Sequence, residues 1–406
     1  MEAVVGFRNY LVVTAGYWAF TITDGAIRML VVLYFHNLGY SPLEIAMLFL
    51  FYEFFGVVTN LVGGWVGSRI GLNLTMNIGM GLQVLALLML TVPDAWLSVP
   101  YVMAAQALSG IAKDLNKMSA KASVKLMLPR GEGAGDARLF RWVAVLTGSK
   151  NALKGAGYFI GGALLTLVGF RGALFSLAGG LFLVLVATVV LLPRDLGKSR
   201  ARAKFTQIFS KTREINWLSA ARFFLFGSRD VWFVVGLPVF LISVLDWSNT
   251  EVGGFLALWV IGYGIVQAMA PRLLNSRRQH QGPDGSTARL WVFLLTLVPS
   301  GIAIALMQGM EPAYTIIIGL TLFAVIFAIN SALHSYLILA YSDHDKVAMN
   351  VGFYYMANAG GRLVGTVLSG WVYQEQGLVG CLWWSAGFVL MAGILSLPLP
   401  SNSKRA

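Results

Sequence analysis

Charged residues are scarce in this chain. They make up 12% of its 406 residues, whereas 57% of the residues are hydrophobic and the mean hydropathy is +0.71. A soluble chain of this length carries about a quarter charged residues. The composition therefore excludes an ordinary soluble globular protein and favours a polytopic membrane protein, most of which lies within the lipid bilayer.

Cysteine and histidine are also scarce. Cys381 is the single cysteine, and the four histidines, His36, His280, His334 and His344, are widely separated. Disulfide frameworks and cysteine-based zinc or iron–sulfur sites need paired or fourfold thiols. We therefore expect no disulfide, no metal site and no cofactor.

Basic residues outnumber acidic ones by 30 to 18, which gives a net charge of +12. Most of the lysines and arginines lie in short polar loops, and these loops alternate with loops that carry almost none. By the positive-inside rule, the basic loops and both termini face the cytoplasm. Because membrane orientation accounts for most of this charge, we expect no nucleic-acid partner.

Twelve apolar runs have the length of about twenty residues that a transmembrane helix needs. The first carries Asp24 and Arg28 and lacks a small-residue cleavage site, so we expect a retained helix and not a signal peptide. The sequence predicts an all-α protein with transmembrane helices at 10–36, 43–66, 73–92, 98–121, 141–168, 172–192, 216–244, 250–270, 289–308, 313–340, 347–373 and 380–399.

The chain repeats itself at an offset of about half its length. The segment LGYSPLEI at 38–45 returns as LDWSNTEV at 245–252, and glycines at 162 and 169 return at 370 and 377. We therefore expect two pseudo-symmetric six-helix halves. Such parallel repeats are typical of the major facilitator fold, which holds its substrate near the bilayer midplane between the halves. The expected divisions are an N-terminal half at 1–193, a basic cytoplasmic linker at 194–215 and a C-terminal half at 216–406, in a monomer.

Thirteen charged residues lie within the expected spans beyond the first two residues of each, where a charge facing lipid at a helix centre costs about 2.5–3.5 kcal/mol. The nine basic ones are Arg28, Lys113, Lys117, Lys121, Lys150, Lys154, Arg222, Arg229 and Arg362. The four acidic ones are Asp24, Glu53, Asp114 and Asp230. The protein's own acids cannot neutralise this surplus of five positive charges, so we expect an anionic ligand to do so.

Helical spacing groups these cations. Lys113 and Lys117 are four residues apart, as are Lys150 and Lys154, so each pair lies on one face of its helix. We expect one anionic end of a ligand to meet Lys113, Lys117 and Lys150, and the other end to meet Arg28, Lys154, Arg229 and Arg362. No catalytic residue is expected.

Three acids are candidates for proton coupling: Asp24, Glu53 and Asp230. Other interpretations remain open, because Asp24 with Arg28, and Arg229 with Asp230, could be structural ion pairs. Glu53 has no basic residue one helical turn away, so it is either a helix-packing carboxylate or a proton carrier.

The lysine-bearing segments GIAKDLNKMSAK at 110–121 and GSKNALKG at 148–155, together with Thr23-Asp24-Gly25, resemble the ArsJ family. Members of this family are organoarsenical efflux permeases of the major facilitator superfamily. The resemblance implies export of 1-arseno-3-phosphoglycerate, formed when glyceraldehyde-3-phosphate dehydrogenase uses arsenate in place of phosphate. It also implies arsenate resistance and a multi-pass antiporter of the bacterial inner membrane. It does not assign individual binding residues, so the site residues above rest on the charge argument.

Two other functions remain open. A sugar-phosphate or organic-phosphate exchanger would need the same cationic interior. A polytopic membrane enzyme would need a cluster of carboxylates and histidines near one membrane face, and the only such cluster is Asp343, His344 and Asp345, which we interpret as a hydrated turn.

Overall fold

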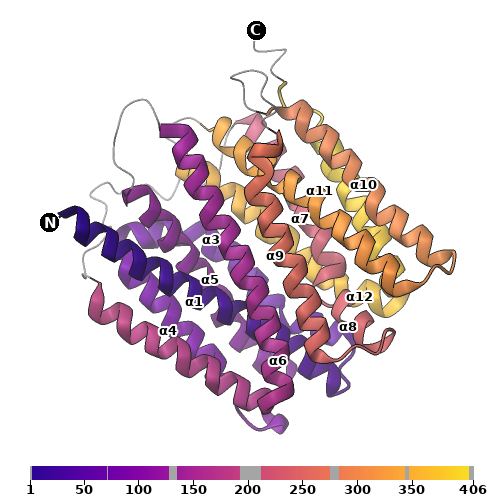
Figure 1. Cartoon of the computed structure of the whole chain (residues 1–406), viewed down its shortest axis with the longest axis horizontal. Helices are drawn as coiled ribbons and strands as arrows, with labels where there is room; N and C mark the ends of the chain where they lie inside the picture. Colours follow the sequence, from indigo (N-terminus) through magenta and orange to yellow (C-terminus); the bar gives the residue numbers. More distant parts are fainter. Residues whose placement is uncertain are drawn as a thin grey trace.

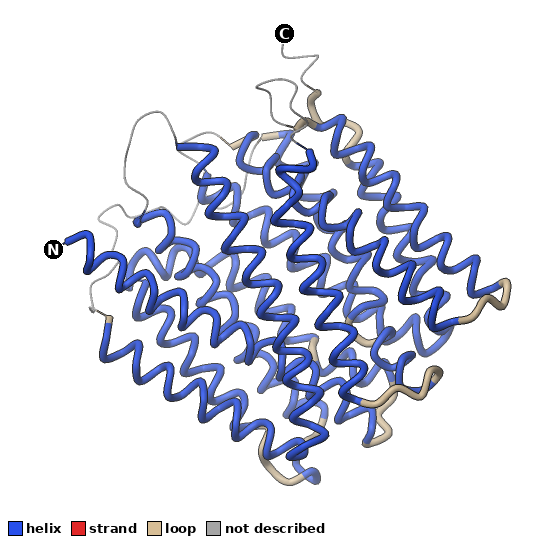
Figure 2. The backbone as a smooth tube through the Cα atoms, viewed as in Figure 1, coloured by secondary structure: helices blue, strands red, loops and turns tan. Residues whose placement is uncertain are grey.

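The computed structural model describes residues 2–70, 72–127, 135–192, 212–274, 283–342 and 347–401. Regular structure in these residues is helical throughout, and none of them forms a strand (Figure 2). This confirms the all-α prediction.

The N-terminal half contains seven helical elements. They are α1 (Glu2–Asn37), α2 (Pro42–Leu48), α3 (Leu50–Ile70), α4 (Leu72–Met89), the short 3-10 helix η1 (Asp94–Trp96), α5 (Val99–Met127) and α6 (Gly135–Leu191). The C-terminal half contains α7 (Arg213–Phe233), α8 (Gly236–Ser243), α9 (Asn249–Leu274), α10 (Gly285–Met307), α11 (Pro312–Ala340) and α12 (Val347–Leu395). The two halves occupy separate regions of the bundle, and they meet where the part of α6 before Gly169 packs against α9 (Figure 1).

These elements make twelve membrane passes, as the sequence predicts. Helices α6 and α12 each cross twice, because Gly169 (φ 72°) and Gly377 (φ 64°) interrupt their helical backbone in the left-handed region that glycine favours. Helices α2 and α3 together form one pass, and so do α7 and α8. The expected linker at 194–215 lies mostly outside the described residues, and α7 begins within it at Arg213.

The repeat detected in the sequence has a structural counterpart at two helix starts. Ser41 and Glu44 form a capping box, in which the Ser41 backbone N–H donates to Glu44 Oε2 at 2.8 Å. Ser248 donates to Glu251 Oε2 in the same way at 2.7 Å, 207 residues later. Each glutamate N–H donates back to its serine Oγ at 3.3 Å. The two helix starts thus have the same geometry at the offset of the sequence repeat, which supports two halves with the same fold.

Glycines let the two halves approach closely in a symmetric way. A Cβ atom on Gly162 of α6 would lie 2.6 Å from the Asn249 carbonyl oxygen at the start of α9. A Cβ atom on Gly370 of α12 would lie 2.5 Å from the Pro42 carbonyl oxygen at the start of α2. The α6–α9 and α12–α2 contacts therefore join the halves at two equivalent places of the repeat.

Because the number of passes is even, α1 begins and α12 ends at the same end of the bundle, here called the terminus end. The opposite end, here called the turn end, carries the helix caps at Ser41 and Ser248. At the turn end the hydroxyls of Thr166 and Thr250 lie 3.1 Å apart, so the halves are in contact there.

Candidate anion-binding site

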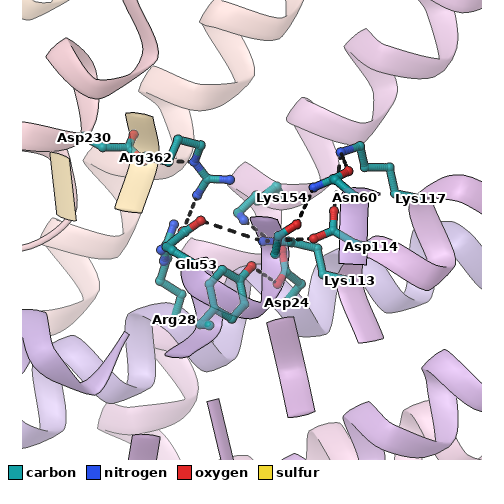
Figure 3. Close-up of polar contacts among 12 residues, drawn as sticks. Asp24, Arg28, Glu53, Asn60, Lys113, Asp114, Lys117, Lys154, Asp230 and Arg362 are labelled. Atoms are coloured by element: carbon teal, nitrogen blue, oxygen red, sulfur yellow. Dashed lines mark hydrogen bonds and ion pairs between the residues drawn. The ribbon is translucent and has the colours of Figure 1, made fainter. Parts of the chain in front are cut away.

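Ten charged side chains from six helices form one network in the interior, most of which is drawn in Figure 3. Eight of them are connected by ion pairs, and the separate Asp24–Lys154 pair joins these eight through Tyr52. Its six cations are Arg28, Lys113, Lys117, Lys154, Arg229 and Arg362. Its four acids are Asp24, Glu53, Asp114 and Asp230. The network draws on α1, α3, α5 and α6 of the N-terminal half and on α7 and α12 of the C-terminal half.

Arg362 joins the two halves. Its Nη2 donates to Glu53 Oε1 of α3 at 2.7 Å, and its Nε donates to Asp230 Oδ2 of α7 at 2.9 Å. Arg28 donates to the same Glu53 Oε1 at 2.7 Å, and Arg229 pairs with Asp230. Each of these two fully buried carboxylates therefore holds two guanidinium groups.

Two lysines of α5 connect Glu53 to Asp114 and Asn60. Lys113 Nζ lies 3.9 Å from both Glu53 Oε2 and Asp114 Oδ2 and 3.9 Å from the centre of the Tyr52 ring. These distances are those of long ion pairs and a cation–π contact, not of hydrogen bonds. Lys117 Nζ lies 3.4 Å from Asp114 Oδ1 and donates to the side-chain oxygen of Asn60 at 3.0 Å.

Lys154 of α6 forms the closest lysine pair. Its Nζ donates to Asp24 Oδ2 of α1 at 2.8 Å, and the Tyr52 hydroxyl donates to Asp24 Oδ1 at 2.5 Å. The backbone of α1 approaches α6 closely at this point, because a Cβ atom on Gly25 would lie 2.4 Å from the Lys154 carbonyl oxygen. Small residues in this stretch therefore position the pair, as expected for packed transmembrane helices.

The network presents cations and hides carboxylates. The six cations exceed the four acids by two charges. The lysines and arginines other than Arg28 keep 11–16% of their side-chain surface accessible, whereas the four acids keep at most 4%. A molecule that reaches this surface meets positive charge, which suits an anion.

The Major Facilitator Superfamily profile matches residues 13–283, which is more than half of the sequence. The chain belongs to the major facilitator superfamily. This membership makes it a multi-pass membrane transporter and not an enzyme.

Two solved structures show the same fold. A bacterial homologue of the iron transporter ferroportin, in its inward-facing state, matches 97% of this chain and 98% of its own, with 18% identity and a TM-score of 0.67. A POT family transporter in complex with 5-aminolevulinic acid matches 96% of this chain and 95% of its own, with 14% identity and a TM-score of 0.74. At such identities the likeness concerns the fold alone. A comparison with curated proteins finds no significant match.

Within this transporter, most of the expected site residues come together. Six of the seven expected anion-binding residues belong to the network. We expected two separate groups of cations, one for each end of the ligand, and Lys113 connects these groups through Glu53 and Asp114. The seventh, Lys150, lies one helical turn before Lys154 on α6, is partly buried and is not among the ion pairs above. Lys121 lies on α5, and its side chain is outside the described part of the structure.

The partners of the acids differ from the sequence-based expectations. Asp24 pairs with Lys154 and Arg28 pairs with Glu53, so the alternative of a structural Asp24–Arg28 pair does not hold. Arg229 and Asp230 do form a pair. Glu53 has cations on three sides, which come from α1, α5 and α12. A search along its own helix could not find them, because every partner is distant in sequence.

Proposed function

We propose that this transporter exports an organic polyanion by alternating access, with 1-arseno-3-phosphoglycerate as its substrate. The observation that supports this proposal most is the cationic surplus between the halves. An anion bound there would neutralise charges that the four buried carboxylates leave over. In this account the substrate contacts the accessible faces of Lys113, Lys117, Lys154, Arg229 and Arg362.

The charge of the substrate fits the site. A molecule with a phosphoryl and an arsenyl end carries about three to four negative charges near neutral pH, by analogy with phosphate monoesters. The network surplus of two, together with the nearby cations outside it, can balance most of that charge. The identity of the substrate comes from the resemblance of segments 110–121 and 148–155 to the ArsJ family.

Binding would act on the contact between the halves. Arg362 holds Glu53 of the opposite half, so an anion that binds Arg362 competes with Glu53 for the same guanidinium. The anion supplies negative charge to both halves and lowers the repulsion among their cations when they close around it. The halves then rock about the fixed site and open it to the other side.

The positive charge of the site favours the exchange of one anion for another. Protonation of Asp24, Glu53 or Asp230 would raise the net positive charge of the site and strengthen anion binding, so a proton would travel with the anion and not against it. In the empty transporter the cations of the site repel one another. The change back to the cytoplasm-facing state is therefore easier when a counter-anion, such as inorganic phosphate, occupies the site. Asp24, Glu53 and Asp230 remain the candidates for proton coupling if export requires it.

The proposal places the protein in the bacterial inner membrane as a monomer, with both termini and the basic linker in the cytoplasm. Its functional partner is glyceraldehyde-3-phosphate dehydrogenase, which would supply the arsenate ester in the cytoplasm. Export before this unstable ester hydrolyses would confer arsenate resistance.

Uptake by inside-out membrane vesicles tests the substrate. The arsenate ester is generated outside the vesicles by glyceraldehyde-3-phosphate dehydrogenase, and arsenic in washed vesicles is compared with uptake of labelled 3-phosphoglycerate. We expect arsenic uptake that depends on the dehydrogenase and is strongly reduced by Arg362→Gln. Uptake of 3-phosphoglycerate alone would instead support the organic-phosphate exchanger, and uptake of neither would contradict the proposal.

A further inference from the structure

Among the residues that the structure describes, Arg222 is a buried cation without a carboxylate partner. It lies on α7, is 4% exposed and takes part in none of the ion pairs formed by the described residues. Its Nε donates to Asn358 Oδ1 at 2.9 Å, and its Nη1 lies 3.4 Å from the Ser331 carbonyl oxygen. Neutral oxygens solvate the guanidinium, but its full positive charge remains in a low-dielectric interior.

Further polar groups surround this arginine. Gln267 of α9 donates to Ser331 Oγ at 3.1 Å and accepts from Asn151 of α6 at 2.8 Å, so the cluster connects both halves. His334 lies one turn after Ser331 on α11, on the same side of that helix. It is fully buried, and neither of its ring nitrogens has a hydrogen-bond partner in the described structure. Both ring nitrogens can therefore form hydrogen bonds to a bound molecule.

The cluster lies beside the ion-pair network. Arg222 and Arg229 are two turns apart on one face of α7, and both lie against the ring of Phe226. Their guanidinium carbons lie 3.7 Å and 5.3 Å from its centre, so the two carbons are at most about 9 Å apart. Arg222 is the one nearer the start of α7, so the cluster lies on the terminus-end side of the network.

We propose that Arg222, with Asn358, Ser331, Gln267 and His334, forms a second anion subsite that binds one end of a substrate with two anionic ends. The other end binds at Arg229 and Arg362. This inference rests on the proposed export of a polyanion and specifies its class: a short organic molecule with an anionic group at each end. The unpaired charge of Arg222 provides the attraction, and the amide and imidazole groups complete the hydrogen bonds.

A pair of ligands separates this subsite from the network. Both 3-phosphoglycerate and glycerol 3-phosphate have three carbons and one phosphate, but only the first has a second anionic end. Calorimetric titration of the full-length protein in lipid nanodiscs gives the ratio of their affinities. We expect the wild-type protein to prefer 3-phosphoglycerate by about ten- to hundredfold, the range expected for one charge-assisted contact.

Arg222→Gln should reduce this preference to about twofold or less, and Arg222→Lys should retain part of it. Asn358→Asp places a carboxylate against Arg222 in a side chain of the same size and should also remove the preference. The matched control is Arg171→Gln, which removes an arginine from an exposed pair with Asp94 and should keep the wild-type ratio.

The outcomes distinguish the two proposals. A wild-type ratio in both Arg222→Gln and Asn358→Asp would overturn the second subsite, as would equal wild-type affinity for the two ligands. Binding of neither ligand to the wild-type protein would overturn the proposed polyanion export and the subsite with it. Melting temperatures of the variants show that each titrated protein is folded.

Discussion

Arg362 and Glu53 form the residue-level contact that defines the site, because they join the halves through a single 2.7 Å hydrogen bond. Composition and helical spacing were enough to select these residues as charged and interior. They could not reveal which cation meets which acid, because the partners of Glu53 come from α1, α5 and α12. Pairing of residues so distant in sequence depends on tertiary packing, which hydrophobic patterns do not encode.

Arg362→Gln should weaken anion binding more than it weakens the fold. Glu53 keeps Arg28 and Asp230 keeps Arg229, so neither carboxylate loses its last guanidinium. We expect the affinity for 3-phosphoglycerate to fall about ten- to hundredfold, with little change in melting temperature. Unaltered affinity in calorimetric titration would remove Arg362 from the site.

Lys154→Gln should also weaken anion binding, but at a greater cost in stability. It leaves the buried Asp24 carboxylate with the Tyr52 hydroxyl and no hydrogen-bonded cation, a type of change that costs about 3–5 kcal/mol in buried pairs. The double variant Asp24→Asn with Lys154→Gln should recover the melting temperature but not the anion affinity. If the double variant melts no higher than Lys154→Gln, the Asp24–Lys154 pair has no structural role.

Neutralising the acids one at a time tests the driving ion. We expect Asp24→Asn, Glu53→Gln and Asp230→Asn each to keep the wild-type ratio of uphill export to anion exchange, because antiport between anions needs no proton carrier. The measurement compares phosphate-driven export with exchange at equilibrium in proteoliposomes. Loss of uphill export with normal exchange in one variant would identify that acid as a proton carrier.

At the level of the helices, the sequence predicted the membrane-spanning segments well but not the helix breaks inside them. Glycines 169 and 377 fall in the expected gaps between spans, so the two long helices α6 and α12 divide where the repeat indicates. The break between α7 and α8 lies inside one expected span, 216–244. It could not be predicted locally, because Ser369 of α12 accepts hydrogen bonds from the Val235 and Gly236 backbone N–H groups at the break.

Gly370→Ala should perturb the contact between the halves. The added methyl group would lie 2.4 Å from Ala46 Cβ, so α12 and α2 must separate, and overpacking of this kind costs about 1–3 kcal/mol. We expect a lower melting temperature and slower transport. Gly387→Ala on the same helix is the matched control, because its Cβ would have no atom within 4 Å. Equal effects of the two substitutions would contradict the close packing at Gly370.

At the scale of the whole molecule, the composition, the repeat and the interior charges together predicted a twelve-helix transporter, and the fold agrees. The expected surplus of five charges was a count along the sequence. In space, six of those nine cations share all four acids, and Arg222 is solvated by neutral groups instead. The network therefore has a surplus of two positive charges, which is smaller than the expected five, and this surplus lies where both halves meet.

A disulfide at the turn end should stop alternating access. Thr166 and Thr250 belong to opposite halves, and their hydroxyls are 3.1 Å apart, so Thr166→Cys with Thr250→Cys should form a bond on oxidation. We expect oxidation to abolish transport and reduction to restore it, whereas each single variant remains active. The native Cys381 is buried and should not interfere. Normal transport by the cross-linked protein would mean that the turn end does not open.

A crystal structure with bound 3-phosphoglycerate would be decisive. We expect density for the phosphate between the halves, within hydrogen-bonding distance of Arg362 and at least one of Lys154 and Arg229. We also expect the carboxylate of the same molecule to lie near Arg222. Ion pairs identical to those described above, with no ligand density between the halves at saturating concentration, would contradict this expectation.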